Sequence, residues 1–230
     1  MADNGAGPSA LASLQVFARS TATLAPGLDH TEIYTPHGLL TVLAHHPEPS
    51  TRAPVAIVMG GGAMGGLLGP GHALYQRLGD AWSARGVASY RVGYRIPNDL
   101  DRCAHDMACA VEMAAEAGAE RIVLMGHSFG GAVAIRVAVV MTDLVVGVVT
   151  FATQSGGCEV AGALAGRPLL LFHGDRDEIL PMQASEMVQM IAGSGELVVC
   201  EGDGHLLGRS DELIVGRLDE WLPDTLGAVV

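Results

Sequence analysis

The sequence predicts an α/β protein whose central sheet is mostly parallel, with about eight strands and helices on both faces. Short apolar runs rich in Val, Ile and Leu alternate with longer amphipathic stretches along most of the chain. The apolar runs lack an alternating polar face, which is typical of strands buried on both sides. With 230 residues, the chain is long enough for one such domain, which would bury roughly 70% of its unfolded surface.

The N-terminal part contains few regular signals. Residues 1–10 are rich in Gly, Ala and Pro and are expected to be disordered, so the single domain is expected over residues 11–230. A spacing of three between apolar residues suggests a short amphipathic helix around residues 11–17. Residues 31–35 and 39–45 are expected to be two strands of a hairpin.

From residue 55 onward, strands and helices are expected to alternate. The expected strands are 55–59, 87–92, 121–126, 144–151, 168–174 and 196–200. The expected helices are 72–86, 99–118, 129 to about 141, 182–193 and 211–222. Residues 152–167 alone separate two core strands, which is too short for a cap domain. Since ligands bind beyond the carboxyl ends of parallel strands, functional residues are expected in the loops that follow them.

Composition and charge exclude several functions. The net charge of −12 disfavours nucleic acid and anionic membranes as partners, because both bind positive surfaces. All 13 basic side chains are arginine, so a lysine Schiff base and a Walker-type phosphate loop are excluded. No window has the roughly 20 uninterrupted apolar residues of a membrane span. The N-terminus lacks the basic residues of a secretory signal, so a cytoplasmic location is expected, with the four cysteines as free thiols.

Residues 126–130 read G-H-S-F-G between an expected strand and an expected helix. This pattern predicts a nucleophile elbow, a tight turn that exposes Ser128 and needs small flanking residues. The alternative is that Ser128 only caps the following helix. A serine nucleophile needs a base to take its proton and an acid to orient that base.

Two later loops offer this acid and base. Asp175 and Asp177 follow the strand 168–174 in H-G-D-R-D, and His205 follows the strand 196–200 in E-G-D-G-H. His205 is the candidate base, with an exposed loop histidine as the alternative. Asp175 competes with Asp177 for the role of acid, although a role in bracing the turn suits Asp175 better.

The elbow, the H-G-x-x-D stretch, the G-x-G-H stretch and their order resemble the α/β-hydrolase fold, over about residues 31–222. Within this fold the chain is similar to the small lidless serine esterases of the dienelactone hydrolase group. The resemblance implies Ser128, Asp177 and His205 as the catalytic residues. Dienelactone hydrolases have a cysteine nucleophile where this chain has Ser128, so the resemblance does not imply a dienelactone substrate.

The glycine-rich stretch VMGGGAMGG at residues 58–66 has two interpretations. Gly60, Gly62 and Gly65 satisfy the dinucleotide fingerprint G-x-G-x-x-G, but two strands precede this loop and the next strand lacks the acidic residue that would bind a ribose. The resemblance instead implies an oxyanion hole formed by the N–H groups of Gly61 and Phe129, with Gly62 or Ala63 as alternatives to Gly61. No cofactor is expected.

Substrate contacts are expected from Met64, Arg95 and His127. Met64, with Leu67 and Leu68, would line an apolar acyl pocket or cover the edge of the core. Arg91 and Arg95 lie where the strand 87–92 leaves the sheet, on the expected site edge, and would bind a carboxylate or form structural ion pairs. His127 lies inside the elbow. The nearby Cys103, His105 and Cys109 favour helix packing over a zinc site, and no metal is expected.

The hypothesis is therefore a cofactor-free serine hydrolase that cleaves an ester, lactone or thioester of a small molecule through an acyl-enzyme. The alternatives are a lyase, a cyclase or a cofactor-free peroxidase with the same three residues, or a non-catalytic binding protein on this scaffold. The expected partner is a small acyl substrate, and a homodimer is compatible with the sequence.

Overall fold

The computed structural model describes residues 9–48 and 53–227, which form nine strands of one sheet. The expected disorder of residues 1–10 falls almost entirely outside the described residues. The strands are β1 (Ala18–Ala25), β2 (Leu28–Thr35), β3 (Gly38–His45), β4 (Val55–Gly60), β5 (Ala88–Gly93), β6 (Arg121–His127), β7 (Val145–Phe151), β8 (Leu169–Gly174) and β9 (Glu196–Cys200). The helices are α1 (Leu74–Ser83), α2 (Leu100–Glu116), α3 (Phe129–Ala138), α4 (Gln183–Ala192) and α5 (Asp211–Leu226), with 3-10 helices η1 (Ala12–Leu14) and η2 (Ala161–Leu164).

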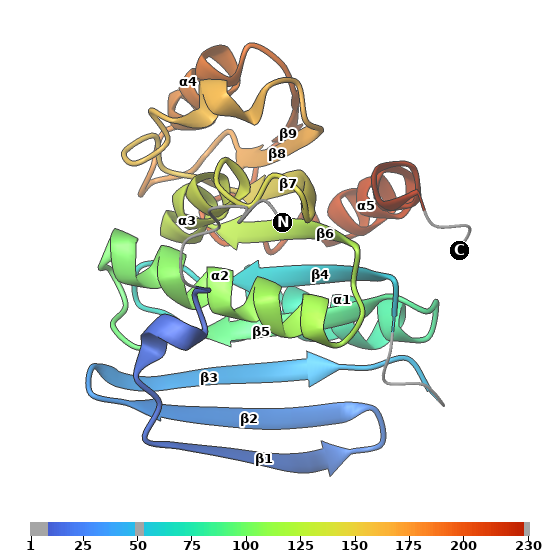
Figure 1. Cartoon of the computed structure of the whole chain (residues 1–230). Helices are drawn as coiled ribbons and strands as arrows, with labels where there is room; N and C mark the ends of the chain where they lie inside the picture. Colours follow the sequence, from blue (N-terminus) through green and yellow to red (C-terminus); the bar gives the residue numbers. More distant parts are fainter. Residues whose placement is uncertain (1–8, 49–52, 228–230) are drawn as a thin grey trace, which may run out of the picture.

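The strand order is β1-β2-β3-β5-β4-β6-β7-β8-β9 (Figure 1). Strands β4 to β9 run parallel to one another, whereas β1, β2 and β3 form an antiparallel meander, and β3 pairs antiparallel with β5. The predicted α/β fold with a mostly parallel sheet is therefore confirmed, with one strand more than expected.

The additional strand is β1, which the sequence does not predict. All eight residues of β1 are exposed, so the strand has no buried apolar face and no periodic signal. Pairing with β2 holds it in place. The helix expected around residues 11–17 is only the single turn η1, in which Leu14 is buried, while Phe17 lies outside it and is 74% exposed.

Helices cover both faces of the sheet and bury two apolar cores (Figure 1). Helices α2, α3 and α4 pack against one face, and α1 and α5 pack against the other. Branched residues of β4 and β6 alternate between the two cores: Ile57 and Val123 contribute to one, Val58 and Leu124 to the other. Such strands are buried on both sides, which explains their continuous apolar sequence.

In the part of the chain that the structure describes, no cap domain covers the carboxyl ends of the parallel strands. Between β7 and β8 the only regular element is η2, in agreement with the prediction. None of the helices in residues 9–48 and 53–227 is long and apolar enough to cross a membrane. The loops after β4, β6, β8 and β9 therefore share one open edge of the sheet.

Candidate active site

Ser128 occupies the turn between β6 and α3. Its backbone has φ 56° and ψ −118°, a conformation that a non-glycine residue adopts only under strain. The turn is so tight that only glycine fits at two of its positions. A Cβ at Gly126 would collide with the carbonyl oxygen of Gly130, and a Cβ at Gly130 would collide with the carbonyl oxygen of Gly61. The side chain of Ser128 makes no capping hydrogen bond to α3, so the alternative in which Ser128 only caps this helix does not hold.

Hydrogen bonds on both sides hold the strained backbone of Ser128. Its N–H donates to the carbonyl oxygen of Phe151 over 2.8 Å, and its carbonyl oxygen accepts from the N–H of Gly131 over 3.0 Å. The side chain is partly exposed at the open edge of the sheet. The fold thus presents a serine hydroxyl in a fixed position.

Asp177 and His205 are joined by a hydrogen bond. Nδ1 of His205 lies 2.7 Å from Oδ2 of Asp177, and because a carboxylate only accepts, Nδ1 carries the proton. In the neutral imidazole, Nε2 then keeps its lone pair. The other oxygen of Asp177 accepts from the N–H groups of Ile179 and Leu180, each over 2.8 Å.

The side chain of Asp177 is fully buried. Burial alone would raise the pKa of this carboxyl, but the hydrogen bonds from Leu180 N–H, His205 and Ile179 N–H outweigh it and lower the pKa below its usual value. Asp177 therefore remains ionised beside His205. Asp175 instead accepts from the N–H of Gly202 over 2.6 Å, which ties two loops together, as its turn-bracing interpretation predicts.

His127 connects the elbow to the loop that carries His205. Its Nε2 donates to the carbonyl oxygen of His205 over 3.0 Å, and the two ring centroids are 5.0 Å apart. Burial lowers the pKa of His127 to about 4, so the ring is neutral near pH 7. Within the part of the chain that the structure describes, no hydrogen bond joins Ser128 Oγ to His205 Nε2.

Gly62, in the loop after β4, lies against the side chains of Ser128 and His127. A Cβ at Gly62 would lie 3.7 Å from Cβ of Ser128 and 3.7 Å from Nδ1 of His127. At Gly61, the expected donor, a Cβ would instead run into the carbonyl oxygens of Gly65 and Gly66. The position next to Ser128 is therefore one residue further along than expected, and it corresponds to the alternative Gly62.

The N–H group of Phe129 lies at the start of helix α3. Phe129 is the first residue of α3, and the first N–H groups of a helix have no acceptor within it. This N–H group directly follows Ser128. Phe129 therefore offers the second donor that an oxyanion next to Ser128 would need.

One expected substrate contact, Arg95, needs correction. The guanidinium of Arg95 pairs with the fully buried carboxylate of Asp106 and lies 3.0 Å from Nδ1 of His105, and only 4% of the Arg95 side chain is exposed. Arg95 thus forms the structural ion pair that was the alternative. Met64 is 93% exposed and points into solvent, whereas Leu67 and Leu68 line a cavity of about 230 Å³ with His127.

Two buried side chains that orient the site were not singled out from the sequence. Asp203 accepts from the N–H groups of Gly204, Arg209 and Ser210, each over 2.8 Å, and so shapes the loop of His205. His173 donates from Nε2 to the carbonyl oxygen of Leu180 over 3.0 Å, 3.3 Å from Oδ2 of Asp177. Their place in the stretches H-G-D-R-D and E-G-D-G-H was the available signal.

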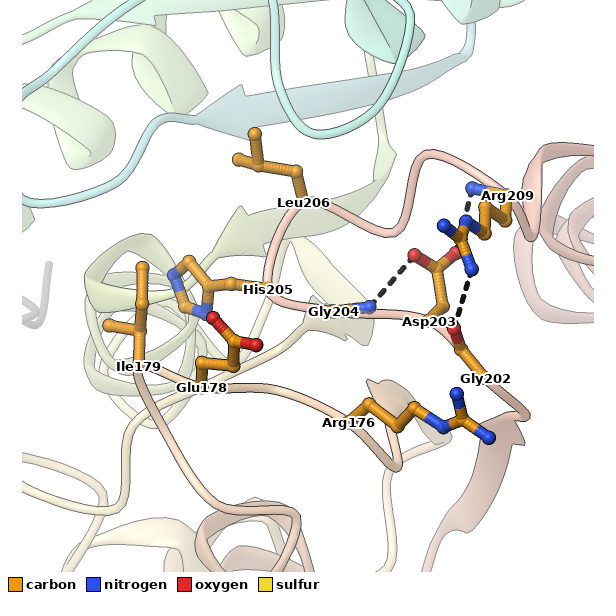
Figure 2. Close-up of a pocket in the computed structure, with 9 residues that line it drawn as sticks. All are labelled: Arg176, Glu178, Ile179, Gly202, Asp203, Gly204, His205, Leu206 and Arg209. Carbon is orange, nitrogen blue, oxygen red and sulfur yellow. Dashed lines mark hydrogen bonds between the residues drawn. The ribbon is translucent and has the colours of Figure 1, made fainter.

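A cavity of about 490 Å³ adjoins His205 (Figure 2). Its lining residues are Arg176, Glu178, Ile179, Gly202, Asp203, Gly204, His205, Leu206 and Arg209. In Figure 2, His205 and Ile179 lie at one end, while the side chains of Arg176 and Arg209 flank Gly202 at the other. Glu178 is drawn on the same side as His205 and Ile179, so an acid accompanies the apolar side chain there and the two arginines lie at the other end.

The four cysteines do not offer a second nucleophile. All four are buried, and none forms a disulfide, which agrees with the prediction of free thiols. Burial raises the pKa of Cys103, Cys109 and Cys158 to about 12, so none forms a thiolate near neutral pH. The nucleophile on the elbow, residues 126–130, is the partly exposed hydroxyl of Ser128.

Comparison with known proteins agrees with this geometry. Residues 98–207 match the family model "Phospholipase/Carboxylesterase". No curated protein sequence matches the chain. The segment 98–207 includes Ser128, Asp177 and His205, and together with the fold it supports a hydrolase that cleaves ester bonds.

Solved structures share the fold at low sequence identity. Est1E from Butyrivibrio proteoclasticus superposes with a TM-score of 0.71 at 18% identity, over 86% of this chain and 99% of its own. XC6422 from Xanthomonas campestris, described as a serine hydrolase without lid, has a TM-score of 0.69 at 20% identity, over 91% and 100%. A dienelactone hydrolase from Anabaena variabilis has a TM-score of 0.71 at 14% identity, over 90% and 98%. The chain has the α/β-hydrolase fold without a lid.

Proposed function

We propose that this lidless α/β hydrolase is a serine esterase that cleaves a carboxylic ester, lactone or thioester of a small molecule through an acyl-enzyme. The observation that carries the proposal is the 2.7 Å bond from His205 Nδ1 to Asp177, which leaves Nε2 of His205 as a base beside the elbow of Ser128. The strained backbone of Ser128 supports it, because strain of this kind is concentrated at functional sites.

In the proposed reaction, Ser128 Oγ attacks the carbonyl carbon while His205 Nε2 takes the hydroxyl proton. This step needs the two side chains to come into hydrogen-bond contact, which catalytic pairs often make only with substrate bound. Asp177 stays ionised and stabilises the imidazolium. The proton then passes to the leaving oxygen or sulfur, and water releases the acyl group by the same steps.

The oxyanion would accept hydrogen bonds from the N–H of Phe129 and the N–H of Gly62. Backbone donors of this kind are already oriented before the reaction, so they stabilise the charge without reorganisation. Gly62 replaces Gly61 in this role because Gly62 lies against Ser128.

The cavity beside His205 favours substrates that carry an anion away from the reacting carbonyl. Arg176 and Arg209 are both exposed there, and two acids, Glu178 and Asp203, share the cavity with them. The carboxylate of Asp203 is buried and accepts from three backbone N–H groups, so Glu178 is the only exposed acid among the lining residues and faces two exposed arginines. An arginine fork suits a carboxylate or phosphate.

The test is hydrolysis of a short p-nitrophenyl ester by the natural chain and by Ser128→Ala. The substitution should lower kcat by at least about three orders of magnitude, and a fluorophosphonate should label Ser128 and no other serine. Ser155→Ala, at a partly buried serine of the loop after β7, is the matched control and should retain activity. Turnover by Ser128→Ala at the natural rate would refute the proposal. Incorporation of oxygen from labelled water into the acid product separates hydrolysis from lyase or cyclase chemistry.

A further inference from the structure

The outer edge of β1 is the largest unpaired stretch of backbone in the sheet. Among residues 9–48 and 53–227, strand β1 pairs with β2 alone, and it lies at the end of the sheet (Figure 1). All eight of its residues are exposed. A bulge between Thr23 and Ala25 affects only its end, and the register with β2 is regular from Ala18 to Thr23.

Strand edges of this kind are usually protected by several charges, by lysine or by proline. Strand β1, with the sequence ARSTATLA, has one charged residue, Arg19, and no proline. The opposite edge of the sheet differs, because β9 is five residues long and its Glu196 pairs with Arg217. The β1 edge is therefore the one open to another strand.

We infer that β1 pairs with β1 of a second copy of this chain in an antiparallel, two-fold symmetric dimer. In such a pair the twofold axis is perpendicular to the sheet, and one residue of β1 lies opposite itself. With Thr21 opposite Thr21, Arg19 lies opposite Thr23 of the second copy, and Thr23 lies opposite Arg19. The two sheets then continue into each other.

Charge complementarity selects this register. Thr23 donates to Asp29 of the neighbouring strand β2 over 2.7 Å, and the two residues are paired on one face of the sheet. Arg19 lies on that same face, because side chains two and four residues apart in a strand share a face. Asp29 of the second copy would lie about two strand spacings, roughly 10 Å, from the Arg19 backbone, which the two side chains together can span.

The symmetry supplies this contact twice, with Arg19 of each copy directed to Asp29 of the other. It also keeps the two Arg19 residues four positions apart along the strands, so the only charge on β1 does not oppose itself. Exposed apolar side chains border the same edge and would lose exposure on pairing: Phe17 is 74%, Leu24 58% and Tyr34 43% exposed. Since the pairing uses the same edge of both copies, the assembly closes at two.

Disulfide cross-linking tests the register. In this dimer the Cα atoms of Thr21 would be about 4.5–5.5 Å apart, within the roughly 4.4–6.8 Å that a disulfide spans. Thr21→Cys should therefore form a covalent dimer on oxidation. Arg19→Cys alone should not, but Arg19→Cys combined with Thr23→Cys should. The four natural cysteines are buried and do not interfere in the folded protein.

Sedimentation of the full chain across a concentration series tests the dimer itself. Arg19→Glu should weaken dimerisation at least tenfold, and Arg19→Glu with Asp29→Arg should restore part of the affinity. Arg102→Glu, at an arginine of α2 whose side chain is 42% exposed, makes the same charge change elsewhere and is the control. A natural chain that remains monomeric overturns the inference. So does a dimer in which neither cysteine design cross-links.

Discussion

His127 Nε2 donates a hydrogen bond to the backbone carbonyl oxygen of His205, 3.0 Å away. The residue before the candidate nucleophile thus holds the backbone of the candidate base. Two loops that are 78 positions apart in the chain are positioned by one buried side chain. His127 is accordingly a positioning residue, and its contribution can be separated from that of Ser128.

His127→Ala should lower kcat on p-nitrophenyl esters by about ten- to a hundredfold, because small displacements of a catalytic group have effects of this size. A fluorophosphonate should still label Ser128, but more slowly. His127→Gln, whose amide can donate to the same carbonyl oxygen, should recover part of the rate. Equal activity of the alanine and glutamine variants would contradict this role.

Stability should also depend on pH through His127. Burial lowers the pKa of this histidine from 6.5 to about 4, so between these values the unfolded chain binds a proton that the folded chain does not. The contribution of His127 to stability is therefore fully present above pH 6.5 and is lost as the pH falls towards 4, by roughly 3 kcal/mol in total.

Denaturant unfolding of the natural chain and of His127→Gln from pH 4 to pH 7 measures this loss. The variant should show a weaker fall in stability over that range. His37→Gln, which removes an exposed histidine between β2 and β3, controls for the loss of one histidine. Parallel curves for the natural chain and His127→Gln would show that His127 is not the responsible group.

Ser128→Gly should stabilise the protein while abolishing activity. A non-glycine residue at φ 56° and ψ −118° carries about 1–3 kcal/mol of strain, which glycine would relieve. The greater freedom of glycine in the unfolded chain would cancel part of that gain. A net gain of about 1 kcal/mol would raise Tm by roughly 2–4 °C. Ser128→Ala is the control, since it also removes the hydroxyl but keeps Cβ, and it should show a smaller gain. A lower Tm for the glycine variant would argue against stored strain.

The two arginines of the cavity beside His205 should determine the preference for charged substrates. For p-nitrophenyl hydrogen glutarate, Arg176→Gln and Arg209→Gln should each raise KM by about three- to tenfold, a modest effect because both side chains are exposed. For the neutral methyl ester of the same substrate, KM should stay unchanged.

Glu178→Gln is the matched control for this preference, because it removes the exposed acid of the same cavity. It should lower KM for the anionic ester and leave KM for the neutral ester unchanged. Equal changes in KM for both esters in the arginine variants would indicate that the shape of the cavity had changed, and would argue against recognition of the substrate's charge.

The sequence predicted the parallel part of the sheet well, because β4, β6, β7 and β8 are continuous apolar runs that can only be buried on both sides. It missed β1, because an exposed edge strand has no apolar periodicity and exists through its backbone pairing with β2. It could not decide the role of Arg95, because the paired Asp106 lies on α2 and only folding brings that carboxylate beside it.

What the sequence determined by itself was the chemistry at each loop: a serine in a glycine-flanked turn, followed by an aspartate and a histidine, each after an apolar strand. The tertiary structure decided which groups meet. It bonded Asp177, not Asp175, to His205, brought Gly62 against Ser128, and used His127 to hold the loop of His205. Residue types and local spacing follow from the chain, but hydrogen bonds between distant loops depend on strand order and register, which are settled only when the whole sheet packs.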